Sequence, residues 1–179
     1  IVENYLKKSD FQVIRAMNGL QALEIQATHA VDLIILDITM PGLDGLEVIN
    51  RIRASEVKSR ILVVTSQSPL FYSQRSMKAG AAGFITKGQD LTELMRAIKI
   101  IMDGYTFFPF LAASSVRNSD ASMSDIEMIQ NLSARELYIL QQLARGLSNK
   151  KIAEDMILSS KTISTYKARL IEKLNIKSV

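Results

Sequence analysis

The chain has 179 residues, of which 47% are hydrophobic and 22% charged, with no cysteine and a formal net charge of +4. This length suits two modest domains, and the composition is that of a globular protein rather than a disordered one. The lack of cysteine excludes disulfides and thiolate metal sites. No apolar run reaches the ~20 residues of a membrane-spanning helix, and the absence of an export leader leads us to expect a cytoplasmic protein without a membrane partner.

The alternation of short apolar segments with segments of helical spacing predicts the fold of the N-terminal part. Apolar segments rich in Val and Ile predict parallel strands, because strands covered on both faces are apolar throughout; they cover residues 11–16, 31–37, 61–66 and 83–87. Apolar residues spaced by three and four predict helices at residues 20–30, 46–55, 70–79 and 91–103. The expected fold class is α/β, a doubly wound parallel sheet with helices on both faces.

The sequence changes character after residue 104. Residues 105–131 contain many Ser and Asn and predict an interdomain linker. Residues 132–179 show no strand pattern and predict a small all-α domain of three helices. This last segment carries 9 Lys and Arg against 4 Asp and Glu, whereas residues 1–104 carry 12 against 11. A basic end suits a polyanionic partner, although a solvated basic face would give the same count.

Three polar residues end apolar strands in the first domain, namely Asp37, Thr65 and Lys87. In an open parallel sheet, chemistry gathers beyond the carboxyl ends of the strands. A carboxylate at this edge can attack a phosphoryl donor and form an acyl phosphate. The hydroxyl of Thr65 would then hydrogen-bond the phosphoryl oxygens, and the ammonium of Lys87 would neutralise their charge.

With Pro41 four residues after Asp37 and Phe84 three before Lys87, residues 1–104 resemble the CheY-like receiver domain of two-component systems. The resemblance implies that Asp37 is the phosphoacceptor and that Thr65, Phe84 and Lys87 form the switch, in which Phe84 turns inward. It also implies a sensor histidine kinase as phosphoryl donor and Mg²⁺ as cofactor, with Asp37 as one ligand. A phosphoacceptor protein without catalytic residues is expected, rather than an enzyme.

Receivers of this family begin with a strand whose end carries an acidic pair that holds Mg²⁺. No acidic pair precedes Asp37 in this way, and that first strand is absent from the chain. We therefore expect an N-terminally truncated receiver with an incomplete metal site. The family's closing helix would follow Val179, so the DNA-binding domain is expected to be truncated at its C-terminus.

Residues 132–179 resemble the LuxR-type helix-turn-helix domain of the NarL/FixJ family. The matching motifs are Leu132-Ser133-x-Arg135-Glu136, Ala144-x-Gly146, Ser148-Asn149-Lys150-x-Ile152-Ala153 and Lys161-Thr162-Ile163-Ser164. Helix signals agree: Ser133 and Glu136 predict a capping box, Gly146 a helix end and Ser148 a second cap. Ser159 or Ser160 would cap a helix that runs to about Leu174. Tyr166 stands in place of the more usual histidine. Together with the sequences at residues 164–167 and 104–109, it indicates a resemblance to the BvgA/EvgA branch, which implies a hybrid sensor kinase.

The last helix has two predicted faces. Ile163, Leu170 and Leu174 fall on one side, with Tyr166 at its border, and should pack on the domain core. In this fold the opposite face enters the major groove of double-stranded DNA. We expect base-edge contacts from Ser164, Thr165 and Ala168, and phosphate contacts from Lys161, Thr162, Lys167 and Arg169.

Together these features predict a DNA-binding response regulator whose phosphorylation on Asp37 modulates dimerisation and promoter binding. A homodimer on inverted half-sites is expected, and RNA polymerase is a further candidate partner. Two alternatives remain open. Asp37 could be the nucleophile of an aspartyl-phosphate enzyme, for which Asp44 is the nearest candidate acid, or the receiver could serve only for dimerisation. His29, the one histidine, is expected at the surface.

Overall fold

In the computed structural model, the described residues are 2–9, 11–40, 42–55, 57–88, 90–109, 128–129 and 131–176. The chain divides into two compact units, Ile1–Ala112 and Ala113–Val179, each considered by itself. Pro41 and residues 110–127, which include most of the predicted linker, lie outside the described residues. Across the described ranges, no helix combines the length and the hydropathy that crossing a membrane requires.

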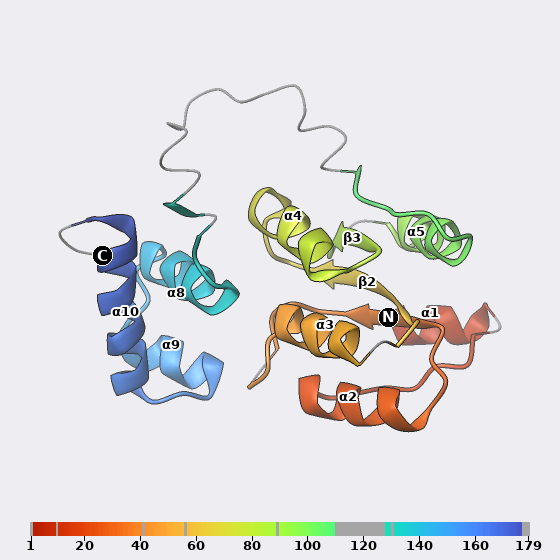
Figure 1. The fold of residues 1–179 in the computed structure, drawn as a ribbon, viewed down its shortest axis with the longest axis horizontal. Helices are drawn as coiled ribbons and strands as arrows, with labels where there is room; N and C mark the ends of the chain where they lie inside the picture. Colours follow the sequence, from red (N-terminus) through yellow and green to blue (C-terminus); the bar gives the residue numbers. More distant parts are fainter. Residues whose placement is uncertain are drawn as a thin grey trace. The chain divides into compact units, whose positions relative to one another are not determined.

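The first unit contains a parallel sheet of three strands (Figure 1). In spatial order these are β1 (Leu33–Leu36), β2 (Arg60–Thr65) and β3 (Gly83–Thr86). The register places Leu36 beside Val63 and Val63 beside Phe84. Because the strands are parallel, the residues that follow their carboxyl ends gather at one edge of the sheet.

Helices cover both faces of this sheet (Figure 1). On one face lie α1 (Val2–Lys8) and α5 (Leu91–Met102), and on the other α2 (Gly19–Thr28), α3 (Gly45–Ala54) and α4 (Pro69–Ala79). The face under α5 is held by a buried apolar cluster of Leu6, Leu62, Ile85, Leu94, Ala97, Ile98, Ile101 and Phe107. The predicted fold class is confirmed, and the four predicted helices agree with the structure to within two residues at each end.

The predicted strand at residues 11–16 is wrong. This segment is not part of the sheet, and its apolar residues Phe11 and Ile14 are 38% and 47% exposed. A strand is stabilised by the ladder it forms with a neighbour. No described strand pairs with residues 11–16 to complete such a ladder, so their β-branched composition alone does not make a strand.

The chain returns to the sheet after α5. The Phe84 N–H donates to the Phe107 carbonyl, and the Phe107 N–H donates to the Ala82 carbonyl, both at 2.9 Å. Gly83 permits this approach, since a Cβ there would lie 2.6 Å from Ile101 Cδ1 and 3.1 Å from the Phe107 carbonyl oxygen. Phe107, which the sequence assigns to the linker, is therefore part of the first unit's core. The domain boundaries themselves remain predictions.

Arg53, near the C-terminal end of α3, joins three chain segments. Its guanidinium donates to the carbonyls of Gly80 at 3.0 Å, Val57 at 3.2 Å and Ser59 at 3.0 Å. Burial lowers the pKa of Arg53, yet a guanidinium stays charged under ordinary conditions. One cation thus satisfies carbonyls in the turns after α3 and α4.

The second unit consists of α8 (Ala134–Ala144), α9 (Asn149–Met156) and α10 (Ser160–Leu174) (Figure 1). Its core is formed by side chains that are at most 2% exposed: Leu137, Ile139, Ile152, Ile163 and Leu170. The predicted caps are confirmed. Ser133, Ser148 and Ser159 each accept a hydrogen bond from the backbone N–H three residues later, and Glu136 completes the capping box.

Residues with positive φ form the turns between the helices of this unit. Gly146 ends α8 with φ 79°, as predicted. Ile157, between α9 and α10, has φ 54° and ψ 48° and is 72% exposed. A left-handed conformation costs a residue with a Cβ about 1–2 kcal/mol. The turn that precedes α10 is therefore made at a local energetic cost.

Candidate functional site

Asp37 directly follows β1 and lies at the carboxyl edge of the sheet. Its Oδ2 is 2.6 Å from Lys87 Nζ, and its Oδ1 accepts a hydrogen bond from the Thr39 N–H at 3.2 Å. The side chain of Asp37 is 24% exposed and that of Lys87 is 50% exposed. The structure thus brings together two predicted site residues from 50 positions apart, with the carboxylate open to a phosphoryl donor.

Asp37 follows β1 and Lys87 follows β3, and Thr65 is the last residue of β2, the strand between them. Thr65 is fully buried, and its Oγ1 accepts a hydrogen bond from the Gln67 N–H at 3.3 Å. Its carbonyl accepts the Lys87 N–H at 2.7 Å, which continues the pairing of β2 and β3 up to the lysine. The position of Lys87 is therefore fixed by backbone hydrogen bonding between β2 and β3.

Gln67 belongs to this edge, although the sequence analysis did not single it out. Its Nε2 donates to Thr39 Oγ1 at 2.9 Å, which joins the loop after β1 to the loop after β2. The only sequence signal is an amide residue two positions after Thr65. This spacing reveals nothing about the partner 28 residues earlier.

Gly45 is a second residue missed from the sequence. Its N–H donates to the Ile38 carbonyl at 2.9 Å, and a Cβ at this position would lie 2.3 Å from the Asp37 carbonyl oxygen. The side chain of the preceding residue, Asp44, caps α3 by accepting the Glu47 N–H at 3.0 Å. Asp44 therefore has a structural role, and the alternative that uses it as the acid of an enzyme loses support.

Phe84 is 2% exposed and lies on β3 opposite Val63. The sequence analysis expects this ring to turn inward when Thr65 moves toward a phosphoryl group. In the structure both residues are already buried. The switch movement itself remains a prediction.

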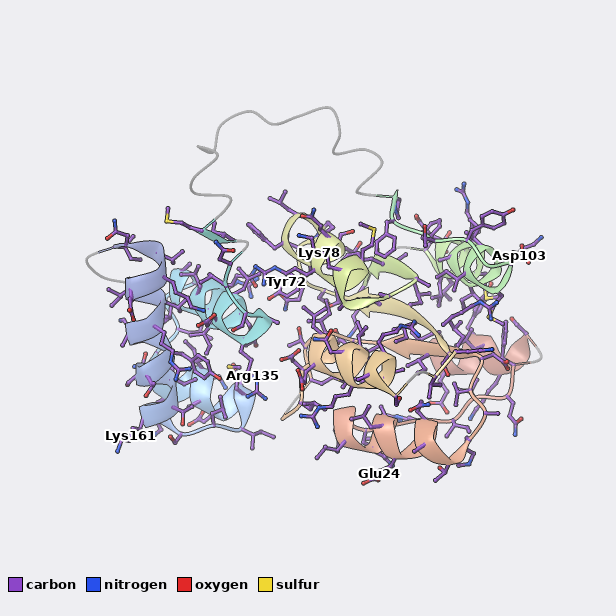
Figure 2. All side chains as sticks on the ribbon, viewed as in Figure 1. Glu24, Tyr72, Lys78, Asp103, Arg135 and Lys161 are labelled. Atoms are coloured by element: carbon purple, nitrogen blue, oxygen red, sulfur yellow. The ribbon has the colours of Figure 1, made fainter. Side chains whose placement is uncertain are left out.

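The second candidate site is the outer face of α10. Ile163 and Leu170 are fully buried as predicted, and Leu174 and Tyr166 are half-buried. Lys161 projects from the N-terminal end of α10 into solvent (Figure 2). Of the seven predicted DNA-contacting residues, Lys161, Ser164, Thr165, Ala168 and Arg169 are exposed, while Thr162 and Lys167 are half-buried.

The hydroxyls on this face are engaged within the protein. Ser164 Oγ donates to the Ser160 carbonyl at 3.1 Å and accepts from Asn149 Nδ2 at 3.3 Å. Thr165 Oγ1 donates to the Lys161 carbonyl at 3.1 Å. Asn149, at the start of α9, was not predicted as a site residue, although its bond to Ser164 connects α9 to the outer face of α10.

A partly buried ion pair fixes the other end of α10. Glu136 Oε2 lies 2.8 Å from Lys173 Nζ and 2.7 Å from the Ser133 N–H, and the glutamate side chain is 5% exposed. Burial raises the pKa of Glu136, but hydrogen bonds from Lys173 and Ser133 outweigh it and leave that pKa below its ordinary value. The charged carboxylate therefore ties the start of α8 to the end of α10.

A parallel sheet with a partly exposed carboxylate and a lysine at its carboxyl edge, together with a separate three-helix unit, is the arrangement expected of a DNA-binding signal receiver. Comparison with protein families leads to the same class. Residues 1–99 match the response regulator receiver domain, and residues 130–179 match the bacterial regulatory proteins of the luxR family. The chain belongs to the NarL/FixJ-type response regulators, which bind DNA and regulate transcription.

Three relatives support this assignment over almost the whole chain. BvgA of Bordetella pertussis, named as a positive transcription regulator of virulence factors, is 46% identical over 175 residues, covering 97% of this chain and 84% of the relative. The Fimbriae Z protein of Salmonella typhimurium is 40% identical, with 97% and 82% covered. EvgA of Escherichia coli K12, named as a DNA-binding transcriptional activator, is 33% identical, with 99% and 86% covered. The predicted resemblance to the BvgA/EvgA branch is confirmed.

Solved structures agree on the fold. A LuxR-family response regulator from Aurantimonas sp. matches with a TM-score of 0.56 and 28% identity, covering 62% of this chain and 84% of the other. RcsB of Salmonella typhimurium matches with a TM-score of 0.56 over 99% of this chain and 86% of the other. At 21% identity, the RcsB match bears on the fold alone.

Proposed function

We propose that this protein regulates transcription in response to phosphorylation of Asp37 by a hybrid sensor histidine kinase. The observation that carries the proposal is the 2.6 Å contact between Lys87 Nζ and Asp37 Oδ2 at a partly exposed carboxylate. An ammonium at this place stabilises the negative charge that a phosphoryl group brings. The alternative of a receiver that serves only for dimerisation gives no reason for this contact.

In the proposed reaction an Asp37 carboxylate oxygen attacks the phosphorus of a phosphohistidine. The P–N bond breaks, the leaving imidazole takes up a proton, and an acyl phosphate forms on Asp37. Lys87 then shifts from the carboxylate to a phosphoryl oxygen. Thr65 accepts the Gln67 N–H and so keeps its own hydroxyl proton for another phosphoryl oxygen.

Transmission from the site would pass through β2 and β3. The Lys87 N–H is bonded to the Thr65 carbonyl at 2.7 Å, so movement of either residue acts on the other. Phe84 lies on β3, the strand that leads directly into Lys87, and its side chain is packed in the core. We assign Thr65, Phe84 and Lys87 to the phosphoryl switch on this basis.

Receiver domains as a class bind Mg²⁺ at the phosphorylation site. Among the described residues, no group of three or more His, Asp or Glu is placed to hold a metal ion. Asp37 itself is held by an ammonium and an N–H, whereas Mg²⁺ requires oxygen ligands in octahedral geometry. Apart from Asp37 as one ligand, the described residues therefore do not provide a binding site for the ion. The metal enters no step of this proposal.

The outer face of α10 is proposed to enter the major groove of DNA. Ala168, Ser164 and Thr165 are small enough for close approach to base edges. Phosphate contacts are assigned to Lys161, Thr162, Lys167 and Arg169. The active form would be a homodimer that lies in the cytoplasm and binds inverted half-sites on DNA. RNA polymerase would be the partner that binds the DNA-bound regulator.

The proposal is tested by incubating the protein with acetyl phosphate and Mg²⁺ and measuring its intact mass. We expect a gain of one phosphoryl group that Asp37→Asn abolishes. Asp44→Asn is the matched control, because asparagine caps a helix about as well as aspartate, and this variant should still be labelled. Labelling that survives Asp37→Asn would refute the assignment. No labelling of either the parent or Asp44→Asn would contradict phosphorylation of Asp37.

A further inference from the structure

Tyr166 and Arg169 form a contact on α10 that neither the motif nor the predicted DNA contacts explain. The Arg169 guanidinium carbon lies 5.9 Å from the centroid of the Tyr166 ring. This distance is within the range of a cation–π interaction. The Tyr166 ring is half-buried at the border of the domain core, whereas Arg169 is exposed. A ring held by core packing therefore lies against a cation that faces solvent.

The direction of the contact matters for DNA binding. Tyr166 precedes Arg169 by one helical turn, and side chains three apart lie next to each other on a helix. The contact therefore holds the guanidinium back toward the N-terminal end of α10. In a helix-turn-helix domain this is the end that approaches the bases and the flanking phosphates.

The ring platform also limits the freedom of the arginine. An exposed arginine ordinarily samples many rotamers, and a phosphate contact has to select one of them. Holding the side chain in advance reduces the entropy lost on binding. Glu172 and Lys173, the exposed charges that follow Arg169 on the same helix, lie on its C-terminal side, away from the direction in which the ring draws the guanidinium.

We propose that Tyr166 is a positioning residue for DNA binding, whose ring holds the Arg169 guanidinium where it reaches a DNA phosphate. This inference rests on the proposed phosphate contact of Arg169. It adds a function for this tyrosine beyond packing at the border of the core. The ring contributes through the arginine and does not itself touch DNA.

The test is a double-mutant cycle on the full chain, with a short synthetic DNA duplex of mixed sequence as the probe. The dissociation constant is measured over a series of salt concentrations for the parent, Tyr166→Leu, Arg169→Ala and the double variant. Arg169→Ala should lower the slope of log affinity against log salt by about 0.9, the value for one phosphate contact. Tyr166→Leu should weaken binding about two- to five-fold when Arg169 is present, and should change nothing in the Arg169→Ala background.

Tyr166→Phe is the matched control, because it keeps the ring and removes only the hydroxyl. We expect it to bind like the parent. Equal weakening by Tyr166→Leu in both backgrounds would overturn the proposal, since the tyrosine would then act through packing. A loss in Tyr166→Phe as large as in Tyr166→Leu would overturn it in favour of a direct hydroxyl contact.

The outcomes also separate this inference from the proposed function. DNA binding by the parent with no change of slope in Arg169→Ala overturns the positioning role but leaves the DNA-binding face intact. Failure of the parent to bind the duplex at any salt concentration overturns both. Thermal unfolding of each variant shows whether a weakened variant is still folded, and Arg169→Ala, at an exposed position, should retain the parent's midpoint.

Discussion

Replacing Lys173 by methionine tests how much the ion pair with Glu136 stabilises the position of α10. The substitution keeps most of the aliphatic stem but removes the ammonium that lies 2.8 Å from Glu136 Oε2. The glutamate is left as a buried carboxylate without its lysine partner, although the Ser133 N–H still donates to it. We expect the second unit to be destabilised and its DNA affinity to fall with it.

The size of the effect follows from the burial of the two partners. Removing one partner of a fully buried ion pair costs about 3–5 kcal/mol. The side chain of Lys173 is 44% exposed, so water screens the pair and we expect about 1–2 kcal/mol. For a domain of this size, each kcal/mol shifts Tm by about 4–8 °C.

The assay is thermal unfolding of the second unit's transition in the full chain, followed by circular dichroism over a range of pH. Because the folded-state pKa of Glu136 is lowered, the pair stabilises the fold fully above the ordinary pKa of 4.5 and loses this effect as the pH falls below it. The gap in Tm between parent and Lys173→Met should therefore narrow below pH 4.5. A gap that stays constant with pH would refute the argument, and so would a gap no larger than that of Lys161→Met, an exposed lysine with no described ion pair.

Three further substitutions have defined outcomes. Gly45→Ala would place a Cβ 2.3 Å from the Asp37 carbonyl oxygen, so we expect about 1–3 kcal/mol of destabilisation together with weaker labelling by acetyl phosphate. Ile157→Gly relieves a left-handed backbone at an exposed position and should raise the free energy of unfolding of the second unit, measured by urea denaturation, by about 1 kcal/mol. Arg53→Met leaves the Gly80 carbonyl and two others without their donor and should cost about 2 kcal/mol, measured by thermal unfolding.

Each of these expectations has a result that contradicts it. An unchanged Tm and full labelling of Gly45→Ala would mean that the loop after Asp37 can shift without cost. A destabilised Ile157→Gly would show that the isoleucine side chain makes contacts that outweigh its strained backbone. Arg53→Lys should recover part of the loss in Arg53→Met, and equal losses in both would show that packing of the stem, not hydrogen bonding, is the main effect.

Elements with strong local signals were predictable from the sequence. The serine caps and the capping box of α8 depend on residues three apart, and each is found where expected. Asp37, Thr65 and Lys87 were predictable as a group, because parallel strands place their carboxyl ends at one edge. In these cases a short-range rule or a topological rule is sufficient.

The contacts that the sequence did not reveal join residues far apart in the chain. Gln67 and Thr39 are 28 residues apart, and Glu136 and Lys173 are 37 apart. No periodicity of 2 or 3.6 residues relates such positions. The strand expected at residues 11–16 failed for a related reason, since a strand depends on its neighbour as well as on its own side chains.

The serine caps of α8, α9 and α10 have a consequence for how this protein responds to ionic strength. Each of the three helices has a neutral serine hydroxyl as its N-cap group, so screening by dissolved ions has little effect on the Ser148 and Ser159 caps. The capping box of α8 also uses the Glu136 carboxylate. The Glu136–Lys173 pair is partly buried and is screened less than surface charges. DNA affinity, in contrast, falls steeply as salt rises. A rise in salt concentration is therefore expected to lower the occupancy of the promoter by the protein, while the second unit stays folded.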